Sequence, residues 1–442
     1  MPVFCIISQL MNKNMSGINR TLTPEFKLIE KINIRKPHSF LLHETIPVYV
    51  LNAGTEDVIR LEIVFDAGAK YSGHPLVAPF TCQMMNEGTT TLSSKEIAEQ
   101  FDFYGAYVHL NSDRDFSEVA LYTLSKHFEN TLGLLTNILT QPVFPQDEFS
   151  VLLDNKRQKY LIDEQKVKTL AAKKFNEVIF GKDNSYGRNS SLEHFDSLTV
   201  QQLKDFHSRL YHDKNARVII SGKITDDVLR ILEKTFRLNK CTMTDSEFQI
   251  SKEVCSDVQK KHYVEKPDAV QSAIRIGKPL VNKHHEDYAG LQILNTVLGG
   301  YFGSRLMMNL REDKGYTYGV GSVVASLKNT GYFTTVCEVG AESTKDAVKE
   351  IYNEIHRLIN EEVEMEELDR VRNYMLGEFV RLFDGPFAQA EAIRSVIDFD
   401  MDETYYEKYL KVLRKITPVE IKALAQKYLQ PDSMFEIVAG KM

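Results

Sequence analysis

The second half of this chain repeats the first at a nearly fixed distance, and this feature constrains the fold more than any other. A helix-like segment that opens at Thr199 reappears at Thr417, and a strand-like segment that ends at Gly222 reappears at Gly440, in both cases 218 residues later. In both helix-like segments a threonine precedes apolar residues at helical spacing, which is typical of a capped helix. Another pair of helix-like segments, beginning FSVLL and LDRV, lies 219 residues apart. Repeated landmarks at one spacing predict a duplicated domain.

Each copy mixes short strands with amphipathic helices. The strand-like segments LEIVF, VALYTL and RVIIS are alternating or short apolar runs, and they do not alternate regularly with helices. This pattern favours a mainly antiparallel sheet over the parallel sheet of a β-α-β fold. The predicted class is therefore α+β, with two homologous domains that each pack helices on one face of a sheet.

The domain boundaries follow from the repeat and from one polar stretch. Residues 237–265 lack sustained periodicity, so we predict a linker there, between an N-terminal domain at 45–236 and a C-terminal domain at 266–442. Residues 1–44 are assigned to an N-terminal extension and first segment. The apolar start of this segment is short, with no preceding basic residue and no small-residue cleavage site, so it does not resemble a secretory signal. We expect the first residues to be a misassigned start or a loose extension.

Composition argues against several functional classes. The 54 Lys and Arg residues against 61 Asp and Glu give a net charge of −7, which argues against broad binding to nucleic acid or to an anionic membrane. No apolar run approaches the roughly 20 residues that a membrane span needs. The five cysteines are scattered and form no CxxC pair, which favours reduced thiols. Together with the lack of a signal, these features predict a cytoplasmic protein.

The most distinctive stretch is LGGYFGSRLMMNLREDKGYTYGVGS at 298–322. Apolar spacing predicts a helix over 288–298, a stop at Gly299-Gly300 and a second helix over about 304–311. This stretch resembles the C-terminal domain of the pitrilysin and mitochondrial processing peptidase family, the inverzincin zinc metallopeptidases. FGKDNSYGR at 180–188 resembles a second family stretch. The resemblance extends over about 45–442, includes the duplication, and implies that the two domains form one half of a clam-shell chamber.

The resemblance also shows what the chain lacks. Active members carry H-x-x-E-H on a helix, with two histidine zinc ligands and a glutamate that activates water. The corresponding positions here read PFTCQ, so Pro79 and Gln83 replace the histidines and Cys82 replaces the glutamate. The family spacing to the third ligand reaches Lys159, whose charge would oppose a divalent cation. We therefore expect no metal site in this chain and no peptidase activity from the chain alone.

One family feature is retained. Active members present an arginine and a tyrosine, seven residues apart, from the C-terminal domain toward the zinc site, and Arg311 and Tyr318 stand at that spacing. A guanidinium can bind substrate carbonyls or a carboxylate, and a phenol can donate to the oxyanion of a tetrahedral intermediate. The alternative interpretation is a surface arginine at a helix end and a core tyrosine in the next strand. The resemblance favours the functional interpretation.

Lost zinc ligands together with a retained Arg–Tyr pair predict the non-zinc subunit of a heteromeric zinc metallopeptidase that acts on unfolded peptides. The resemblance implies a homologous zinc-bearing subunit as partner, with zinc held there and no cofactor in this chain. An extended substrate would add to a sheet edge near Ala106, His109 and Asn111. Two alternatives remain: a catalytically silent structural subunit, like the core proteins of a respiratory complex, and a peptide-binding clamp formed by a homodimer.

Overall fold

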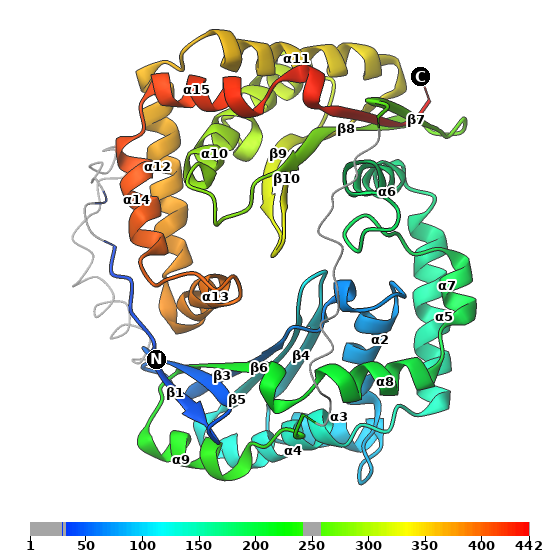
Figure 1. Cartoon of the computed structure of the whole chain (residues 1–442), viewed down its shortest axis with the longest axis vertical. Coiled ribbons are helices and arrows are strands. Elements are labelled where there is room, and N and C mark those ends of the chain that lie inside the picture. The colour runs from blue at the N-terminus through cyan, green and yellow to red at the C-terminus, as the bar shows by residue number, and fades with distance from the viewer. Residues whose placement is uncertain (1–28, 30–31, 242–257, 442) are drawn as a thin grey trace, which may run out of the picture. The chain divides into compact units, whose positions relative to one another are not determined.

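The computed structural model describes residues 29, 32–241 and 258–441. A compact unit begins at Ile34 and contains all of the described helices and strands (Figure 1). Within this unit the chain forms two sheets, one from each half of the sequence. Short 3₁₀ turns link several of the elements, at Ala69–Tyr71, Met85–Glu87, Ser125–His127, Asp213–Asn215, Ala341–Ser343 and Pro431–Ser433.

The first sheet has six strands in the order β1-β2-β6-β3-β5-β4. Only β2 and β6 pair in parallel, and all other neighbours are antiparallel. The strands are β1 His38–Leu42, β2 Ile46–Asn52, β3 Val58–Phe65, β4 Tyr107–Ser112, β5 Ser117–Leu124 and β6 Ala216–Gly222.

The second sheet has five strands in the order β7-β11-β8-β10-β9, and again only one pair, β7 and β11, is parallel. Without β1, the two sheets correspond strand by strand in order and direction, which confirms the predicted duplication and the mainly antiparallel α+β class. The strands are β7 Lys261–Glu265, β8 Gln271–Leu280, β9 Val320–Ser326, β10 Gly331–Gly340 and β11 Phe435–Gly440.

Helices of the first half cover one face of the first sheet. Ile59, Leu61 and Ile63 of β3 are fully buried in the cluster that these helices share with the sheet. Arg60 and Glu62, which alternate with them, point to the opposite face because successive strand residues do so. The first half contains α2 Val77–Met84, α3 Ser94–Phe103, α4 Phe128–Thr140, α5 Gln146–Asp163, α7 Leu192–Ser197, α8 Val200–Leu210 and α9 Asp226–Thr235, together with α6 Val167–Phe180, which packs on the second sheet.

The helices of the second half follow the same order around the second sheet. Thr199 and Thr417, the landmarks of the repeat, each cap a helix by accepting a hydrogen bond from the backbone N–H three residues on. This capping confirms the helix starts that the sequence predicted. The helices are α10 Tyr288–Asn295, α11 Thr344–Asn360, α12 Met365–Leu382, α13 Gly385–Ile397, α14 Tyr405–Lys415 and α15 Pro418–Tyr428.

The two helices predicted around the glycine pair form, but with wider turns than expected. The α-helix ends at Asn295 and continues as a π-helix over Thr296–Gly300, and the second segment is a π-helix over Met307–Asp313. Gly299 is required here because a Cβ on it would lie 2.6 Å from the backbone nitrogen of Ser322. π-helical turns often accompany functional sites.

Each half also extends one helix onto the free face of the other half's sheet. Helix α6 packs on β8 and β11, whereas α13 packs on β6 and β2 (Figure 1). The α6 contact is apolar, with Phe175 and Phe180 buried together with Phe435. The α13 contact combines a small apolar cluster with buried charges. This exchange of helices adds a layer that the sequence did not predict.

Two strands lie in segments that we assigned to other roles. Strand β1 lies within the first segment, 1–44, and β7 occupies the last five residues of the predicted linker. Strand β7, with the sequence KHYVE, is a short and partly exposed edge strand, and charged edge strands of this kind carry little hydrophobic signal. Residues 242–257 of the predicted linker lie outside the described residues.

Candidate functional site

Helix α2 carries the residues that stand at the positions of the zinc motif. Cys82 is fully buried, and its thiol donates to the carbonyl oxygen of Asn111 at 3.3 Å. Burial raises the pKa of this thiol to about 12, so it stays protonated and is a poor metal ligand. Pro79 has no side-chain donor atom, and Gln83 carries only a neutral amide. These groups do not fit the three His or acidic ligands of a catalytic zinc site.

The position of the third ligand lies on α5. Lys159 is exposed there, one turn from Lys156. Burial lowers the pKa of Lys156, and the charge of Lys159 lowers it further. Two lysines at this place oppose a divalent cation. Across the parts of the chain that the structure describes, no group of three or more His, Cys, Asp or Glu side chains could hold a metal ion.

The structure brings Arg311 and Tyr318 together. Arg311 lies in the second π-helix, Tyr318 lies in the loop before β9, and the guanidinium carbon is 5.1 Å from the centre of the tyrosine ring. Tyr318 is 90% exposed, so the alternative of a core tyrosine is wrong. Tyr318 projects from the surface because the loop places it before the strand begins, whereas the Arg311 side chain beside it is only 28% exposed.

Sequence reasoning missed a third member of this cluster. The ring of Phe302 is 62% exposed, and its centre lies 4.5 Å from the Arg311 guanidinium carbon. The neighbouring Tyr301 packs against Tyr374 of α12 at 4.9 Å between ring centres, which anchors the glycine-rich loop. The Arg311 guanidinium therefore lies near two aromatic rings, that of Phe302 before the π-helix and that of Tyr318 after it. Cation–π contacts of this kind orient a guanidinium. Phe302 stands within GGYFGS at 299–304, but the glycines of this stretch were interpreted only as helix stops and close-packing positions.

The predicted substrate edge is a sheet edge. Strand β4 is the last strand of the first sheet and, among the described strands, pairs only with β5. His109 and Asn111 are exposed, while the alternating Val108 and Leu110 pack toward the core. Ala106 precedes the strand and donates its N–H to the carbonyl oxygen of Phe101 at 2.9 Å. The free edge can therefore accept an added strand.

A cavity of about 780 Å³ lies where β4 ends, between the two halves of the chain. Pro79, the first position of the altered motif, lines this cavity, and neither Arg311 nor Tyr318 does. Within this chain, the altered zinc motif and the Arg–Tyr pair therefore do not line a common cavity. The lining residues are Ala69, Pro79, Ser112, Asp113, Arg114, Asp115, Phe116, Ser326, Leu327, Tyr332, Glu391, Arg394, Ser395, Asp398 and Phe399.

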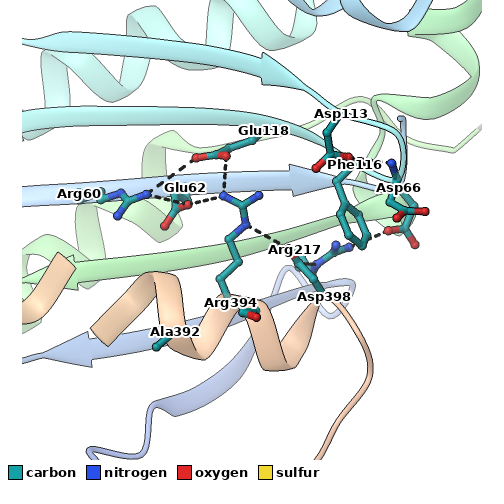
Figure 2. A network of polar contacts seen from close by, with 12 residues as sticks. Arg60, Glu62, Asp66, Asp113, Phe116, Glu118, Arg217, Ala392, Arg394 and Asp398 are labelled. Atoms are coloured by element: carbon teal, nitrogen blue, oxygen red, sulfur yellow. Dashed lines mark hydrogen bonds and ion pairs between the residues drawn. The ribbon is translucent and has the colours of Figure 1, made fainter. Parts of the chain in front are cut away.

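One wall of the cavity is an ionic network that sequence reasoning did not find (Figure 2). Arg394 of α13 reaches across to Glu62 of β3 at 2.9 Å and to Glu118 of β5 at 2.5 Å. The same guanidinium pairs with Asp398 at 3.0 Å, and Asp398 pairs in turn with Arg217 of β6 at 2.6 Å. The network joins α13 to three strands of the other half's sheet.

Burial changes the pKa of one carboxyl group in this network, that of Glu62. Glu62 is fully buried, and burial raises its pKa from 4.5 to about 7, although the charges of Arg60 and Arg394 act in the opposite direction. Arg60 pairs with Glu62 at 3.0 Å and with Glu391 of α13 at 2.8 Å. Buried pairs of this kind tolerate the loss of one partner poorly.

The turn between β9 and β10 is tied to the first half by a second cluster. Asp115 pairs with Lys70 at 2.8 Å and accepts a hydrogen bond from the Tyr186 hydroxyl at 2.6 Å. Its other oxygen accepts the backbone N–H of Lys328 at 3.0 Å. Asn329 accepts a hydrogen bond from Lys70 at 3.2 Å. The turn therefore borders the cavity in a fixed position.

The chain thus combines a duplicated α+β fold, a helix α2 without zinc ligands and an arginine beside an exposed tyrosine. Residues 197–375 match the model of a family described as "Peptidase M16 inactive domain". This match agrees, over those residues, with the resemblance that the sequence predicted.

The relatives differ in the activity that their names state. The chain is 24% identical over 316 residues to "Uncharacterized zinc protease YmxG" of Bacillus subtilis (strain 168), covering 69% of this chain and 73% of that protein. It is 24% identical over 377 residues to "Non-peptidase homolog YmxG" of Helicobacter pylori (strain ATCC 700392 / 26695), covering 83% and 84%. The crystal structure titled as the peptidase M16 inactive domain from Pseudomonas fluorescens superposes with a TM-score of 0.82 at 21% identity, over 92% of this chain and 98% of that one. No helix within the described residues is long and apolar enough to cross a membrane.

Proposed function

We propose that this protein is the non-zinc subunit of a heteromeric zinc metallopeptidase that acts on unfolded peptides. It would supply Arg311 and Tyr318 to the zinc site of a homologous partner subunit. The observation that carries the proposal is the exposure of Tyr318: a tyrosine that is 90% exposed and lies beside an arginine can reach a site on another chain. Zinc belongs to the partner in this proposal, and this chain holds no cofactor.

The chemistry of the pair suits this role. The Tyr318 hydroxyl can donate a hydrogen bond to the oxyanion that forms when water attacks a peptide carbonyl. Arg311 pairs only through Nε with its sequence neighbour Glu312, at 3.5 Å, among the ion pairs of the described residues. The rest of the guanidinium fork is therefore available to a substrate carbonyl or carboxylate.

The chain's own motif supports action in trans. The α2 positions lack zinc ligands, and the cavity that Pro79 lines does not include the Arg–Tyr pair. A complete site thus needs ligands from another chain. The proposal places the complex in the cytoplasm, where the buried thiols of Cys82 and Cys337 would stay reduced.

Reconstitution tests the proposal. The protein and a homologue that carries H-x-x-E-H are purified separately and mixed, and the cleavage of an unfolded peptide is followed. We expect neither subunit alone to be active and the mixture to be active. Full activity of the zinc-bearing homologue by itself, unchanged by the addition of this chain, would contradict the proposal.

A second candidate function is a non-catalytic peptide clamp. The free edge of β4 beside the 780 Å³ cavity supports it, because an extended peptide can add to such an edge. The discriminating measurement is the binding of a labelled unfolded peptide to this chain alone. Tight binding without a zinc-bearing partner, combined with no activity in the mixture, would favour the clamp.

A further inference from the structure

A groove of about 610 Å³ lies between α14, α15 and the start of α10. None of its residues belongs to the cavity between the halves or to the Arg–Tyr cluster. The groove is lined by Glu286, Asp287, Gly290, Lys408, Lys411, Val412, Lys415, Ile416, Glu420, Ala423, Leu424 and Lys427.

The floor of the groove is apolar. Val412 and Ile416 come from the end of α14 and the residue after it, and Ala423 and Leu424 come from α15. Gly290 of α10 lies directly against Leu424, because a Cβ on this glycine would be only 2.6 Å from the Leu424 Cδ1. The glycine lets α10 and α15 approach closely, so the α10 backbone forms part of the groove floor beside the apolar side chains.

The α14 wall carries a stripe of lysines. Lys408, Lys411 and Lys415 are all exposed and follow one another at three and four residues, which places them on one helix face over roughly 10 Å. Lys408 pairs with Asp402 at 2.9 Å. Lys411 and Lys415 form no ion pair within the described part of the chain. This wall therefore presents two unneutralised positive charges in a chain whose net charge is −7.

Most of the acidic lining residues are already engaged. Asp287 pairs with Lys427 at 2.7 Å and accepts a hydrogen bond from the Tyr428 hydroxyl at 2.7 Å. Glu420 accepts hydrogen bonds from the N–H and the hydroxyl of Thr417, as part of the α15 cap. Glu286 forms no ion pair with any of the described residues, and it lines the groove just before α10 begins. The groove thus combines an apolar floor, a basic wall along α14 and an opposite wall that carries the carboxylates of Glu286 and Glu420.

We propose that this groove is a docking site for an acidic amphipathic helix of a partner protein. The apolar residues of that helix would enter the floor, as in other helix-in-groove complexes. Its Asp and Glu residues, spaced by one helical turn, would face Lys411 and Lys415. Complementary charge along one wall would fix the orientation and speed association. The site is independent of the proposed action of the Arg–Tyr pair in trans.

Fluorescence anisotropy with a synthetic probe tests this inference on the full chain. The probe is a fluorescein-labelled 14-residue helix with leucines on one face and glutamates on the single flank that would face Lys411 and Lys415. We expect saturable binding that weakens as salt is raised, because exposed charges contribute. A peptide of the same composition with leucine and glutamate shuffled should bind at least tenfold more weakly, a free-energy difference of about 1.4 kcal/mol or more.

Charge reversal in the groove supplies the decisive comparison. Lys411→Glu combined with Lys415→Glu should lower the affinity for the probe at least tenfold. The matched control is Lys345→Glu combined with Lys349→Glu, two exposed lysines at the same spacing on α11, and it should bind like the unmodified protein. Ala423→Trp, which fills the groove without changing charge, should also weaken binding.

Three outcomes would overturn the inference. Equal binding of the shuffled peptide would show that shape plays no part. Equal loss in the α11 control would show a general charge effect. Binding of the unmodified protein to vesicles containing phosphatidylglycerol, lost in the α14 double variant while the peptide probe does not bind, would assign the lysines to a membrane surface instead.

Discussion

Arg311 lies beside Tyr318, and in the proposed function the two side chains act on a substrate rather than stabilise the fold. Arg311→Ala should therefore lower the kcat of the reconstituted complex by about 10²–10³ while the melting temperature stays nearly constant. Arg311→Lys should restore little, because an ammonium cannot reproduce the bidentate fork. The measurement is steady-state kinetics of the mixed subunits. Arg381→Ala, an arginine on α12 whose side chain is 77% exposed, is the matched control and should keep full activity.

Phe302 is expected to position the Arg311 side chain. Its ring lies 4.5 Å from the Arg311 guanidinium carbon, so its loss should free the side chain to sample other orientations. Phe302→Ala should raise KM or lower kcat of the mixed subunits, and Phe302→Tyr should restore activity because it keeps the ring. If Phe302→Ala matches the unmodified protein in both constants, the aromatic contact has no positioning role.

Cys82 shows at residue scale why the zinc site cannot be rebuilt by one change. Glutamate at the motif's general-base position would place a carboxylate where the present side chain is fully buried. Burying such a charge without a partner costs several kcal/mol or forces the group to stay protonated. Cys82→Glu should therefore lower the melting temperature clearly, whereas Cys82→Ser should lower it less. Metal analysis should find no stoichiometric zinc in the unmodified protein, and one tightly held zinc per chain would contradict the proposal.

At the scale of elements, α13 is held on the first sheet by buried charges. Arg394→Met would leave Glu62, Glu118 and Asp398 without their shared guanidinium, and breaking buried pairs in this way typically costs about 3–5 kcal/mol. Arg381→Met, at an exposed position, should stay within about 0.5 kcal/mol of the unmodified protein. Denaturant unfolding checks both values. Equal stability of the two variants would show that the network does not hold α13.

The same network predicts a pH dependence. The groups that face Glu62 are Arg60 on its own strand, Glu118 on β5, and Arg394 on α13. Because the pKa of Glu62 is raised from 4.5 to about 7 by burial, the folded state holds a proton that the unfolded chain releases between these values. The free energy of unfolding should therefore fall as pH rises through this window, by at most about 1.4 kcal/mol per pH unit.

Glu62→Gln isolates this contribution, because the amide cannot titrate. The difference in unfolding free energy between this variant and the unmodified protein should change between pH 4.5 and 7 and level off above that range. Glu129→Gln, at an exposed position on α4, is the control for the general effect of replacing a carboxyl by an amide. A flat difference for Glu62→Gln across the range would show that this carboxyl titrates normally.

Most helices and strands could be predicted from patterns among residues that are close in sequence. Thr199 and Thr417 cap their helices as expected because capping depends on residues only three positions apart. The ionic network could not be predicted in this way, since Arg394 and Glu62 are 332 residues apart in sequence. In β3, Arg60 and Glu62 alternate with apolar residues, a pattern typical of a solvent-exposed face. Only the arrival of α13 from the other half turns that face into an interface.

At the scale of the whole molecule, duplication and divergence explain the proposed division of labour. The two sheets retain one strand order, yet the α6 contact is apolar whereas the α13 contact is ionic. Helix α2 of the first half carries Pro79, Cys82 and Gln83, which do not suit zinc, and the second half carries Arg311 beside the exposed Tyr318. Size-exclusion chromatography of this chain with the H-x-x-E-H homologue should show a heterodimer. Profiles that never shift would favour the homodimeric clamp.

The most direct test of the central claim is the kcat of the reconstituted pair when this chain carries Tyr318→Phe. The substitution removes only the hydroxyl of an exposed ring, so assembly and melting temperature should not change. If the hydroxyl donates to the oxyanion in the partner's site, kcat should fall by about 10²–10³, a transition-state effect. A kcat equal to that of the unmodified pair would contradict the claim that this subunit completes its partner's active site through Tyr318.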